Sequence, residues 1–409
     1  MNAPGTTTAE VATHSVTAWR NAVMACFALG GVTVSTWGPR LAELRADLRV
    51  GDATLGLVLA GVTVGAITGL AASSAVLGRL GPRRGICAML WLVAAGVAVI
   101  GLGAGVAHSV PATAAGFAAV GLGIGASDVM INVEGAGVER AAGRTLMPLM
   151  HAAWSAGAIV GAGIGAACAA LRVPVIGQFV GEAVVIVVAA AVAVRYLPGS
   201  IEVPDAADRP PAGVRIRAWL GGWANGRLLL IGLVMLGVEL GEGGANSWLA
   251  LAVRDGHGRP NAVAALFFVA FNVGETLARV VGGPLVDRVG RVRAVRVTTA
   301  VGAVGVALFI LSSPAWLILL GTLLWAVGVS MGFPLGMSAA AESGPNPAAR
   351  VSVVASIGYL ANLAGPPFIG FLSSKIGLLD ALWLVAVLLA VGFAGSGALR
   401  TRRAAAAHA

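Results

Sequence analysis

The chain has 409 residues, of which 58% are hydrophobic and only 11% are charged, with a formal net charge of +9. Soluble globular domains carry about 25% charged residues, so this composition cannot cover the surface of a soluble protein. Nearly uncharged segments of roughly 20 residues recur along the chain, each long enough to cross about 30 Å of hydrocarbon as a helix. The composition therefore indicates a polytopic membrane protein and excludes soluble enzymes, nucleic-acid-binding proteins and secreted scaffolds.

Apolar runs separated by charged or Pro-rich breaks predict twelve membrane-spanning helices. Most of the 27 basic residues fall in loops on the side of the two termini. Because basic residues concentrate in cytoplasmic loops, we expect both termini to lie in the cytoplasm. The predicted spans cover residues 18–38, 53–78, 85–107, 112–136, 146–171, 174–195, 228–252, 262–285, 293–312, 315–340, 350–373 and 378–398.

An internal repeat relates the two halves of the chain. The turn after the second span, residues 78–84, reads GRLGPRR, and the turn after the eighth span, residues 287–293, reads DRVGRVR. Gly81 aligns with Gly290, about half the chain further on. A repeat of this length indicates a duplicated architecture of two similar halves.

The segment between the halves, residues 197–227, contains four prolines and mixed charges, which a membrane span would not tolerate. We therefore expect a six-helix half over residues 1–196, a cytoplasmic linker over residues 197–227 and a second six-helix half over residues 228–409. The end of the linker is compatible either with a short helix on the anionic inner leaflet or with a solvated loop.

Twelve spans in two halves of six, with a Gly-x-Leu-x-Asp-Arg-x-Gly-Arg turn after spans 2 and 8, resemble the major facilitator superfamily. The second turn, residues 283–291, fits this signature closely, whereas the first has Ser74 at the leading Gly and Gly78 at the Asp position. The resemblance implies an all-α membrane protein with two pseudo-symmetric six-helix halves. It also implies a cytoplasmic gating motif made of Gly283, Asp287, Arg288, Gly290, Arg291, Arg79, Gly81 and Arg83.

Several strings, among them residues 132–140, 147–151 and 241–248, resemble a bacterial inner-membrane subfamily near the fucose-permease branch. The resemblance implies a monomer that works by alternating access: the two halves rock around a central cavity and move a small-molecule substrate across the lipid bilayer. No cofactor and no nucleic-acid partner are implied.

Span 7 carries Glu239, Glu242 and Asn246 at a spacing that places them on one helical face. An ionised group in the middle of the membrane costs several kcal/mol, so a buried acid is a functional candidate by default. Either these residues bind protons or substrate, or the acids are structural and hydrogen-bonded within the helix bundle. We favour the functional interpretation, with Glu242 first.

Span 4 places Asp128 and Asn132 four residues apart on one face, with Glu134 turned away from them. Glu134 and His151 lie at similar distances from the turn between spans 4 and 5. The two are either a proton-sharing pair or a bridge that clamps two helices. Asp128 is the better candidate for proton coupling in this half.

Span 8 contains Asn272, Glu275 and Arg279, and the last two are four residues apart and are expected to pair along the helix. We favour a structural or gating role for the pair over contact with the substrate. Near the end of span 1, Arg40 either contacts an anionic substrate or extends to the lipid head groups, and we favour the second interpretation.

Span 5 carries Gly157, Gly161 and Gly165 at intervals of four residues. Small residues at this spacing form a smooth ridge along which a second helix can pack closely. We therefore expect this ridge to be a helix–helix contact.

We therefore predict a secondary active transporter that couples movement of a small organic solute to protons. The alternatives are an exporter of a hydrophobic metabolite or drug and a transporter-like membrane sensor. An ATP-driven pump is excluded because the only lysine, Lys375, is not part of a phosphate-binding loop. A metalloprotease and other metal sites are excluded because the five histidines are scattered, at positions 14, 108, 151, 257 and 408.

Overall fold

The structure, a computed structural model, describes residues 6–198 and 212–400, and the regular secondary structure there is helical. In the first half of the chain the helices are α1 (Thr6–Thr36), η1 (Gly38–Arg40), α2 (Leu41–Leu48), α3 (Asp52–Gly105), α4 (Val110–Ala142), α5 (Met147–Ala170), α6 (Val175–Ala193) and η2 (Val194–Tyr196). They are followed by α7 (Ala212–Trp223), α8 (Gly226–Leu251), η3 (Ala252–Gly256), α9 (Asn261–Val289), α10 (Arg291–Leu311), α11 (Ala315–Ser330), α12 (Gly332–Glu342), α13 (Pro347–Ile376), α14 (Leu378–Ala381), α15 (Trp383–Gly395) and η4 (Ser396–Leu399).

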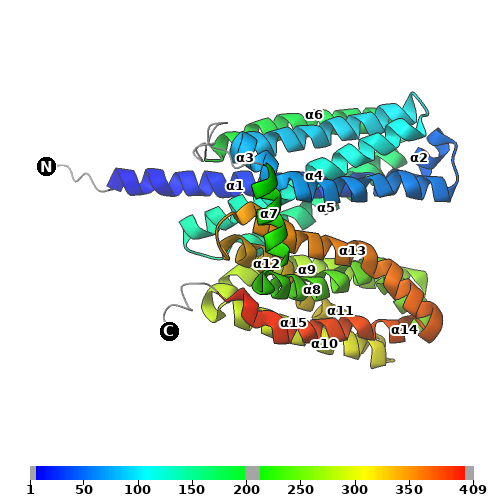
Figure 1. Cartoon of the computed structure of the whole chain (residues 1–409). Helices are drawn as coiled ribbons and strands as arrows, with labels where there is room; N and C mark the ends of the chain where they lie inside the picture. Colours follow the sequence, from blue (N-terminus) through cyan, green and yellow to red (C-terminus); the bar gives the residue numbers. More distant parts are fainter. Residues whose placement is uncertain (1–5, 199–211, 401–409) are drawn as a thin grey trace. The chain divides into compact units, whose positions relative to one another are not determined.

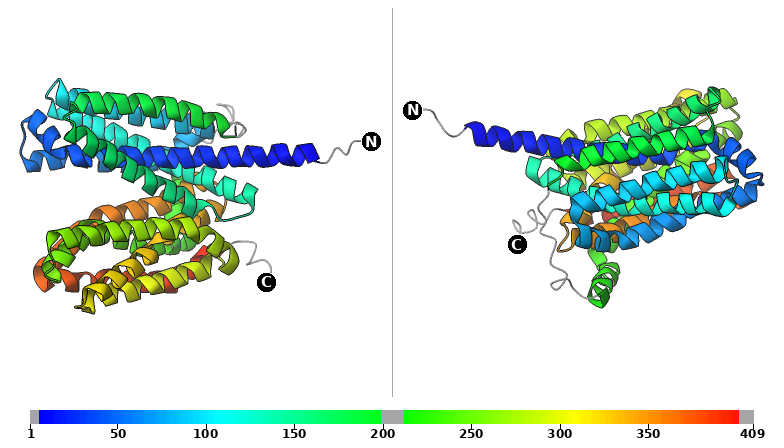
Figure 2. Two further views of the ribbon diagram at one scale, coloured as in Figure 1. Left: turned by 180° about the vertical axis from the view of Figure 1, so that it is seen from behind. Right: turned by 90° about the horizontal axis from the view of Figure 1, so that it is seen from above.

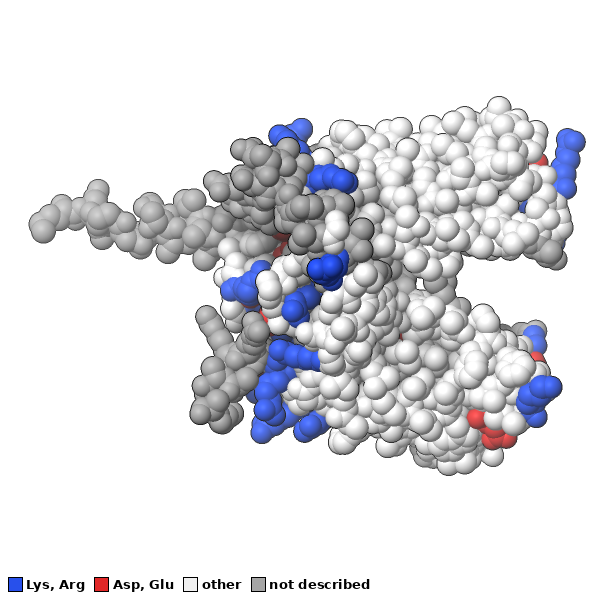
Figure 3. All heavy atoms as spheres, viewed as in Figure 1, with Lys and Arg blue, Asp and Glu red and all other residues white. Residues whose placement is uncertain are grey.

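The chain forms two compact units. The first unit contains Met1–Gly143 and Ala153–Pro210, and the second contains Arg144–Ala152 and Pro211–Ala409. Within each unit the long helices run side by side (Figures 1 and 2). On the face shown in Figure 3, charged side chains gather at the helix ends of each unit, and the surface between them is uncharged. This distribution matches a surface that faces hydrocarbon between two aqueous layers.

Eleven described segments are long and apolar enough to cross a membrane. One of them, Thr54–Gly105 within α3, consists of two helices that meet at Gly81, where the backbone leaves the helical conformation. Counting these two separately gives twelve spans, which confirms the predicted architecture. The predicted span over residues 315–340 is formed by α11 and α12 in succession, and the last span begins with the short α14 before α15.

The repeated turn has the same backbone conformation in both halves. Gly81 has φ 69° and ψ 174°, and Gly290 has φ 84° and ψ 153°. This region of backbone conformation is essentially restricted to glycine, because a side chain at Cβ would be strained there. The repeat in the sequence therefore corresponds to one backbone turn used twice, each time between two consecutive spans.

The glycine ridge of α5 makes the predicted helix–helix contact, and the structure identifies its partner as α1. A Cβ atom placed on Gly157, Gly161 and Gly165 would lie 2.1, 2.1 and 2.2 Å from carbonyl oxygens of α1, those of Ala28, Val32 and Thr36 in turn. Each step of four residues on α5 thus matches a step of four residues on α1. The two backbones approach closely because no side chain separates them.

The core of the second unit brings together buried residues of α8, α9, α10, α11, α13 and α15. Phe271, Phe309 and Trp325 pack edge to face at its centre, with ring centroids 5.7 Å apart for Phe271 and Trp325 and 5.8 Å apart for Phe309 and Trp325. All three side chains are fully buried. Edge-to-face packing of aromatic rings contributes about 0.5–1.5 kcal/mol per pair beyond the burial of area.

The predicted linker, residues 197–227, lies partly outside the described residues, which end at 198 and resume at 212. Its second part forms α7, so the helical alternative is the one that the structure contains. α7 contacts α13 and α8, and Gly222 faces Val353 of α13. The boundaries of the two predicted halves stay a prediction.

The conformation of Gly290 leads to a first prediction. Gly290→Ala is expected to lower the free energy of unfolding by about 1–3 kcal/mol, because alanine is strained at this positive φ. No atom lies within 4 Å of the added Cβ, so the loss comes from the backbone and not from a clash. Thermal unfolding in detergent would measure it. Gly78→Ala, at an exposed helical position that also has open space, serves as the control, and equal stability of both variants would contradict the prediction.

The α1–α5 contact leads to a second prediction. Gly161→Val is expected to force the two helices apart and to destabilise the protein by at least about 1–3 kcal/mol, the typical cost of overpacking. Gly163→Val, two residues along the same helix in open space, is the matched control. Thermal unfolding and the yield of monodisperse protein would show the difference, and equal behaviour of the two variants would exclude the close α1–α5 contact.

Candidate functional site

Arg279 of α9 lies at the centre of a buried group of charges in the second unit. Its Nη2 atom is 2.8 Å from Oε2 of Glu242 on α8 and 2.8 Å from Oε1 of Glu275 on its own helix. Its Nε atom also donates to the carbonyl oxygen of Ser330, at 3.3 Å. The predicted pairing of Glu275 with Arg279 is confirmed, and Glu242 joins the pair from the neighbouring helix.

A third acid, Glu239, lies one turn before Glu242 on α8. It is buried, accepts a 3.4 Å hydrogen bond from Nδ2 of Asn362 on α13, and interacts electrostatically with Arg279 and Glu275. We call Glu239, Glu242, Glu275 and Arg279 the Arg279 cluster. The cluster places three carboxyl groups around one guanidinium.

Exposure differs among the members of the cluster. The Glu275 side chain is 4% exposed, whereas that of Glu242 is 19% exposed. Further along α8, Asn246 is exposed. The α8 face predicted from sequence thus runs from the buried Glu239 through Glu242 to an accessible Asn246.

In the first unit, Asp128 and Asn132 form a buried pair on α4. Nδ2 of Asn132 donates to Oδ1 of Asp128 at 3.1 Å and to the Asp128 carbonyl oxygen at 2.9 Å. The predicted placement of the two on one helical face is confirmed. The amide orients one carboxyl oxygen of Asp128 within the helix bundle.

Glu134 and His151 each have a partner inside their own unit. Oε2 of Glu134 accepts a 2.9 Å hydrogen bond from Nε1 of Trp19 on α1. The His151 ring packs edge to face on Phe333, with centroids 5.3 Å apart. A proton-sharing Glu134–His151 pair stays a prediction.

The second copy of the gating motif is organised around the turn before α5. Oδ1 of Asp287 accepts a 2.8 Å hydrogen bond from the backbone N–H of Thr145. One turn earlier on α9, a Cβ atom on Gly283 would lie 2.7 Å from the Thr145 carbonyl oxygen. The absence of a side chain at Gly283 thus lets α9 approach Thr145 closely enough for Asp287 to bind it.

Arg291 extends the same motif toward α12. Its guanidinium binds both carboxylate oxygens of Glu342, at 2.7 and 3.0 Å, and the Ser338 hydroxyl at 2.7 Å. Arg288 is exposed. In the first copy Arg79 and Arg83 are exposed, and Gly78 stands where Asp287 stands in the second copy.

Sequence reasoning missed a second buried polar group, in the first unit. Oε2 of Glu182 on α6 accepts a 2.8 Å hydrogen bond from the Thr36 hydroxyl. Gln178 donates a hydrogen bond to the same hydroxyl and accepts one from Arg40. Arg40 is buried and bound by protein groups, so the expectation that it extends to lipid head groups is wrong. The signal was present, because Glu182 is a lone acid in an apolar span.

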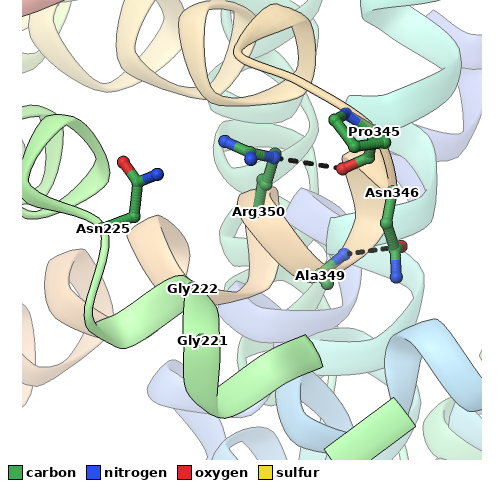
Figure 4. A pocket seen from close by; sticks show the side chains of 7 residues that line it. All are labelled: Gly221, Gly222, Asn225, Pro345, Asn346, Ala349 and Arg350. Atoms are coloured by element: carbon green, nitrogen blue, oxygen red, sulfur yellow. Dashed lines mark hydrogen bonds between the residues drawn. The ribbon is translucent and has the colours of Figure 1, made fainter. Parts of the chain in front are cut away.

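A small cavity lies where α7 meets the loop between α12 and α13 (Figure 4). Its volume is about 200 Å³, below the range of about 300–1,000 Å³ that is typical of ligand pockets. Its polar side chains serve the local structure: Asn225 and Asn346 cap helices, and Arg350 donates to Ser343 and to the Pro345 carbonyl. Among the described residues no group of His, Cys, Asp and Glu is arranged to hold a metal ion.

A model of the family described as Major Facilitator Superfamily matches residues 231–408. The chain is 28% identical over 382 residues to a Sinorhizobium fredii protein described as the uncharacterized transporter y4wD, which spans 92% of this chain and 96% of the relative. It is 28% identical over 366 residues to a Yersinia pestis protein described as an uncharacterized MFS-type transporter, over 89% of this chain and 91% of the relative.

The fold is also that of a solved transporter. FucP, the Escherichia coli fucose:proton symporter, solved in its outward conformation, superposes with a TM-score of 0.78 over 93% of this chain and 98% of FucP. Since the sequence identity is 14%, this likeness shows the fold alone. Residues 231–408 thus match the Major Facilitator Superfamily model, and most of the chain is similar to two proteins described as transporters.

Proposed function

We propose that the protein is a proton-coupled secondary transporter of a small organic solute, with the Arg279 cluster as its proton-binding site. The observation that carries the proposal is the excess of carboxyl groups over cations in this cluster. FucP, whose fold the chain shares, is described as a fucose:proton symporter, and this supports the proposal.

The excess of acids demands protons because of the membrane environment. One guanidinium balances one carboxylate, and each further carboxylate retains an uncompensated charge. A charged side chain near the centre of a membrane helix costs about 2.5–3.5 kcal/mol on insertion scales. Binding a proton removes that cost, so the cluster is expected to hold protons on its surplus acids.

Glu242 is the best candidate for the acid that exchanges its proton. It contacts Arg279 and is also the most exposed acid of the cluster, so solvent or solute can reach it. When Glu242 is protonated, Arg279 stays paired with Glu275; when Glu242 is ionised, it competes for the same Nη2 atom. Proton binding therefore changes how strongly α8 is held to α9.

In the first unit, Asp128 and Asn132 are the proposed counterpart for proton or substrate binding. Glu134 and His151 are further candidates for the same role. Both Asp128 and Asn132 are buried, and the carboxyl group is oriented by the amide.

The proposed location is the bacterial inner membrane, with both termini in the cytoplasm and a monomer as the working unit. The concentration of basic residues in the loops on the side of the termini supports this orientation. In that orientation Gly283, Asp287 and Arg291 fix the cytoplasmic ends of α9 and α10, through Thr145 and Glu342. They are proposed to act as a cytoplasmic gate.

The proposed coupling leads to a third prediction. Glu242→Gln is expected to abolish solute-dependent proton movement while the protein stays folded, because the amide keeps the shape but cannot exchange a proton. The measurement uses proteoliposomes with an internal pH dye, challenged with pooled sugars, organic acids, amino acids and hydrophobic drugs. Asp380→Asn, an exposed acid of α14 outside the cluster, is the control.

The outcome also separates the alternatives. A pH change driven only by hydrophobic drugs would indicate an exporter of such compounds. Thermal stabilisation by a solute without any flux would indicate a membrane sensor. Transport by Glu242→Gln with unchanged pH dependence would show that Glu242 is not the coupling acid.

A fourth prediction concerns the stability of the cluster. Arg279→Gln is expected to cost about 3–5 kcal/mol of unfolding free energy, because it leaves buried carboxylates without a cation. The double variant Arg279→Gln with Glu275→Gln is expected to recover part of that loss, because it removes one of those charges. Thermal unfolding of purified protein would test both, and additive losses would mean that the two side chains do not interact.

A further inference from the structure

A chain of hydrogen bonds in the first unit leads from Arg40 to a buried acid. Nη1 of Arg40 donates to Oε1 of Gln178 at 2.8 Å, and Nε2 of Gln178 donates to the Thr36 hydroxyl at 2.9 Å. That hydroxyl donates in turn to Oε2 of Glu182 at 2.8 Å. Every donor in the chain points toward Glu182, so the positive charge of Arg40 polarises the whole series in one direction.

Among the described residues, no basic side chain is in direct contact with Glu182. Glu182 is 8% exposed, and its second carboxyl oxygen, Oε1, has no hydrogen-bond partner among the described residues. Arg40 does not pair with Glu182, because its guanidinium forms an ion pair with Glu43 and donates to the Val173 carbonyl oxygen at 2.7 Å. The acid thus receives one hydrogen bond and no salt bridge.

The elements around α6 add little charge. α6 packs against α3, α1 and η2, and Glu182 is the only titratable residue of α6 itself. The titratable residues of α1 from residue 21 onward and of α3 from residue 85 onward are the thiols Cys26 and Cys87. Arg195 and Tyr196 of η2 lie about 20 Å from Glu182 along the helix axis, at a rise of about 1.5 Å per residue.

Two opposing effects act on Glu182. Removal from water favours the neutral carboxylic acid, whereas the polarised chain that ends in the Thr36 hydroxyl favours the carboxylate. From this balance we infer that Glu182 is a second proton-binding site, separate from the Arg279 cluster and located at the junction of α1 and α6. Its ligand is a proton delivered by hydronium: the O–H bond of hydronium breaks, a new O–H bond forms at Oε1, and a water molecule is released.

Proton binding at this site would act on the end of α1. Thr36 is the last residue of α1, and its carbonyl oxygen is in close contact with Gly165 of α5. A neutral carboxyl group accepts a weaker hydrogen bond than a carboxylate, so protonation of Glu182 loosens the Thr36 contact. At the other end of this series of hydrogen bonds, Arg40 pairs with Glu43. The Glu43 side chain is 39% exposed and connects the site to the aqueous surface.

Infrared difference spectroscopy of the purified, full-length protein, titrated with acid and base without any solute, tests the inference. Wild-type protein is expected to show the carbonyl signal of a protonated carboxyl group, and Glu182→Gln is expected to lose the signal of one such group. The glutamine can still accept the hydrogen bond from Thr36, so the packing is kept. Glu43→Gln, an acid at the exposed end of the same chain, is the control and is expected to keep the signal.

A second pair of variants keeps the test decisive if Glu182→Gln does not fold. Thr36→Val removes the last donor of the chain and is expected to move the titration midpoint to higher pH by about one unit. Thr33→Val is the matched control, since the Thr33 hydroxyl donates to the Leu29 carbonyl one turn away and does not touch the acid. A carboxyl signal in Glu182→Gln that is as large as in the wild type, or equal midpoints for the two threonine variants, would overturn the inference. Because no solute is present, these outcomes are independent of the Glu242→Gln transport result.

Discussion

A charged side chain inside the membrane must find its counter-charge within the protein, because hydrocarbon supplies neither water nor ions. Two buried arginines satisfy this demand in different ways. Arg279 binds carboxylates of α8 and α9, and Arg40 combines an ion pair with Glu43 and hydrogen bonds to groups of α6 and the loop before it. The positions of these helices in each unit therefore depend on where a few charges stand in an otherwise apolar chain.

Close packing acts together with these charges. Without side chains at Gly157, Gly161 and Gly165, α5 reaches the backbone of α1, and the last of these contacts is with Thr36. The hydroxyl of the same Thr36 binds Glu182. Helix packing and polar contacts thus meet at one residue, and a change in the protonation of the acid bears directly on a tightly packed helix end.

Features that depend on spacing along one helix were predictable from the sequence. The spans, the α5 ridge, the Glu275–Arg279 pair and the Asp128–Asn132 pair all follow from the periodicity of the α-helix. Contacts between helices were not predictable, because a single sequence does not say which helices are neighbours. The contacts of Glu242 with Arg279 and of Glu239 with Asn362 are of this kind. Glu182 is a different case: it was overlooked although a lone acid in an apolar span is itself an indication of a buried polar site.

The two halves share backbone geometry more closely than they share chemistry. Gly81 and Gly290 have similar dihedral angles, so the duplicated turn is kept where only glycine fits. The charge next to that turn is not kept, since Asp287 binds Thr145 while Gly78 offers no side chain. A backbone turn of this kind requires glycine at one position. An ion pair or a hydrogen bond, in contrast, can be lost from one half of a pseudo-symmetric protein and replaced by a different contact elsewhere. The role of each acid must therefore be assigned from the contacts of its own half: Arg279 for Glu242, and the Thr36 hydroxyl for Glu182.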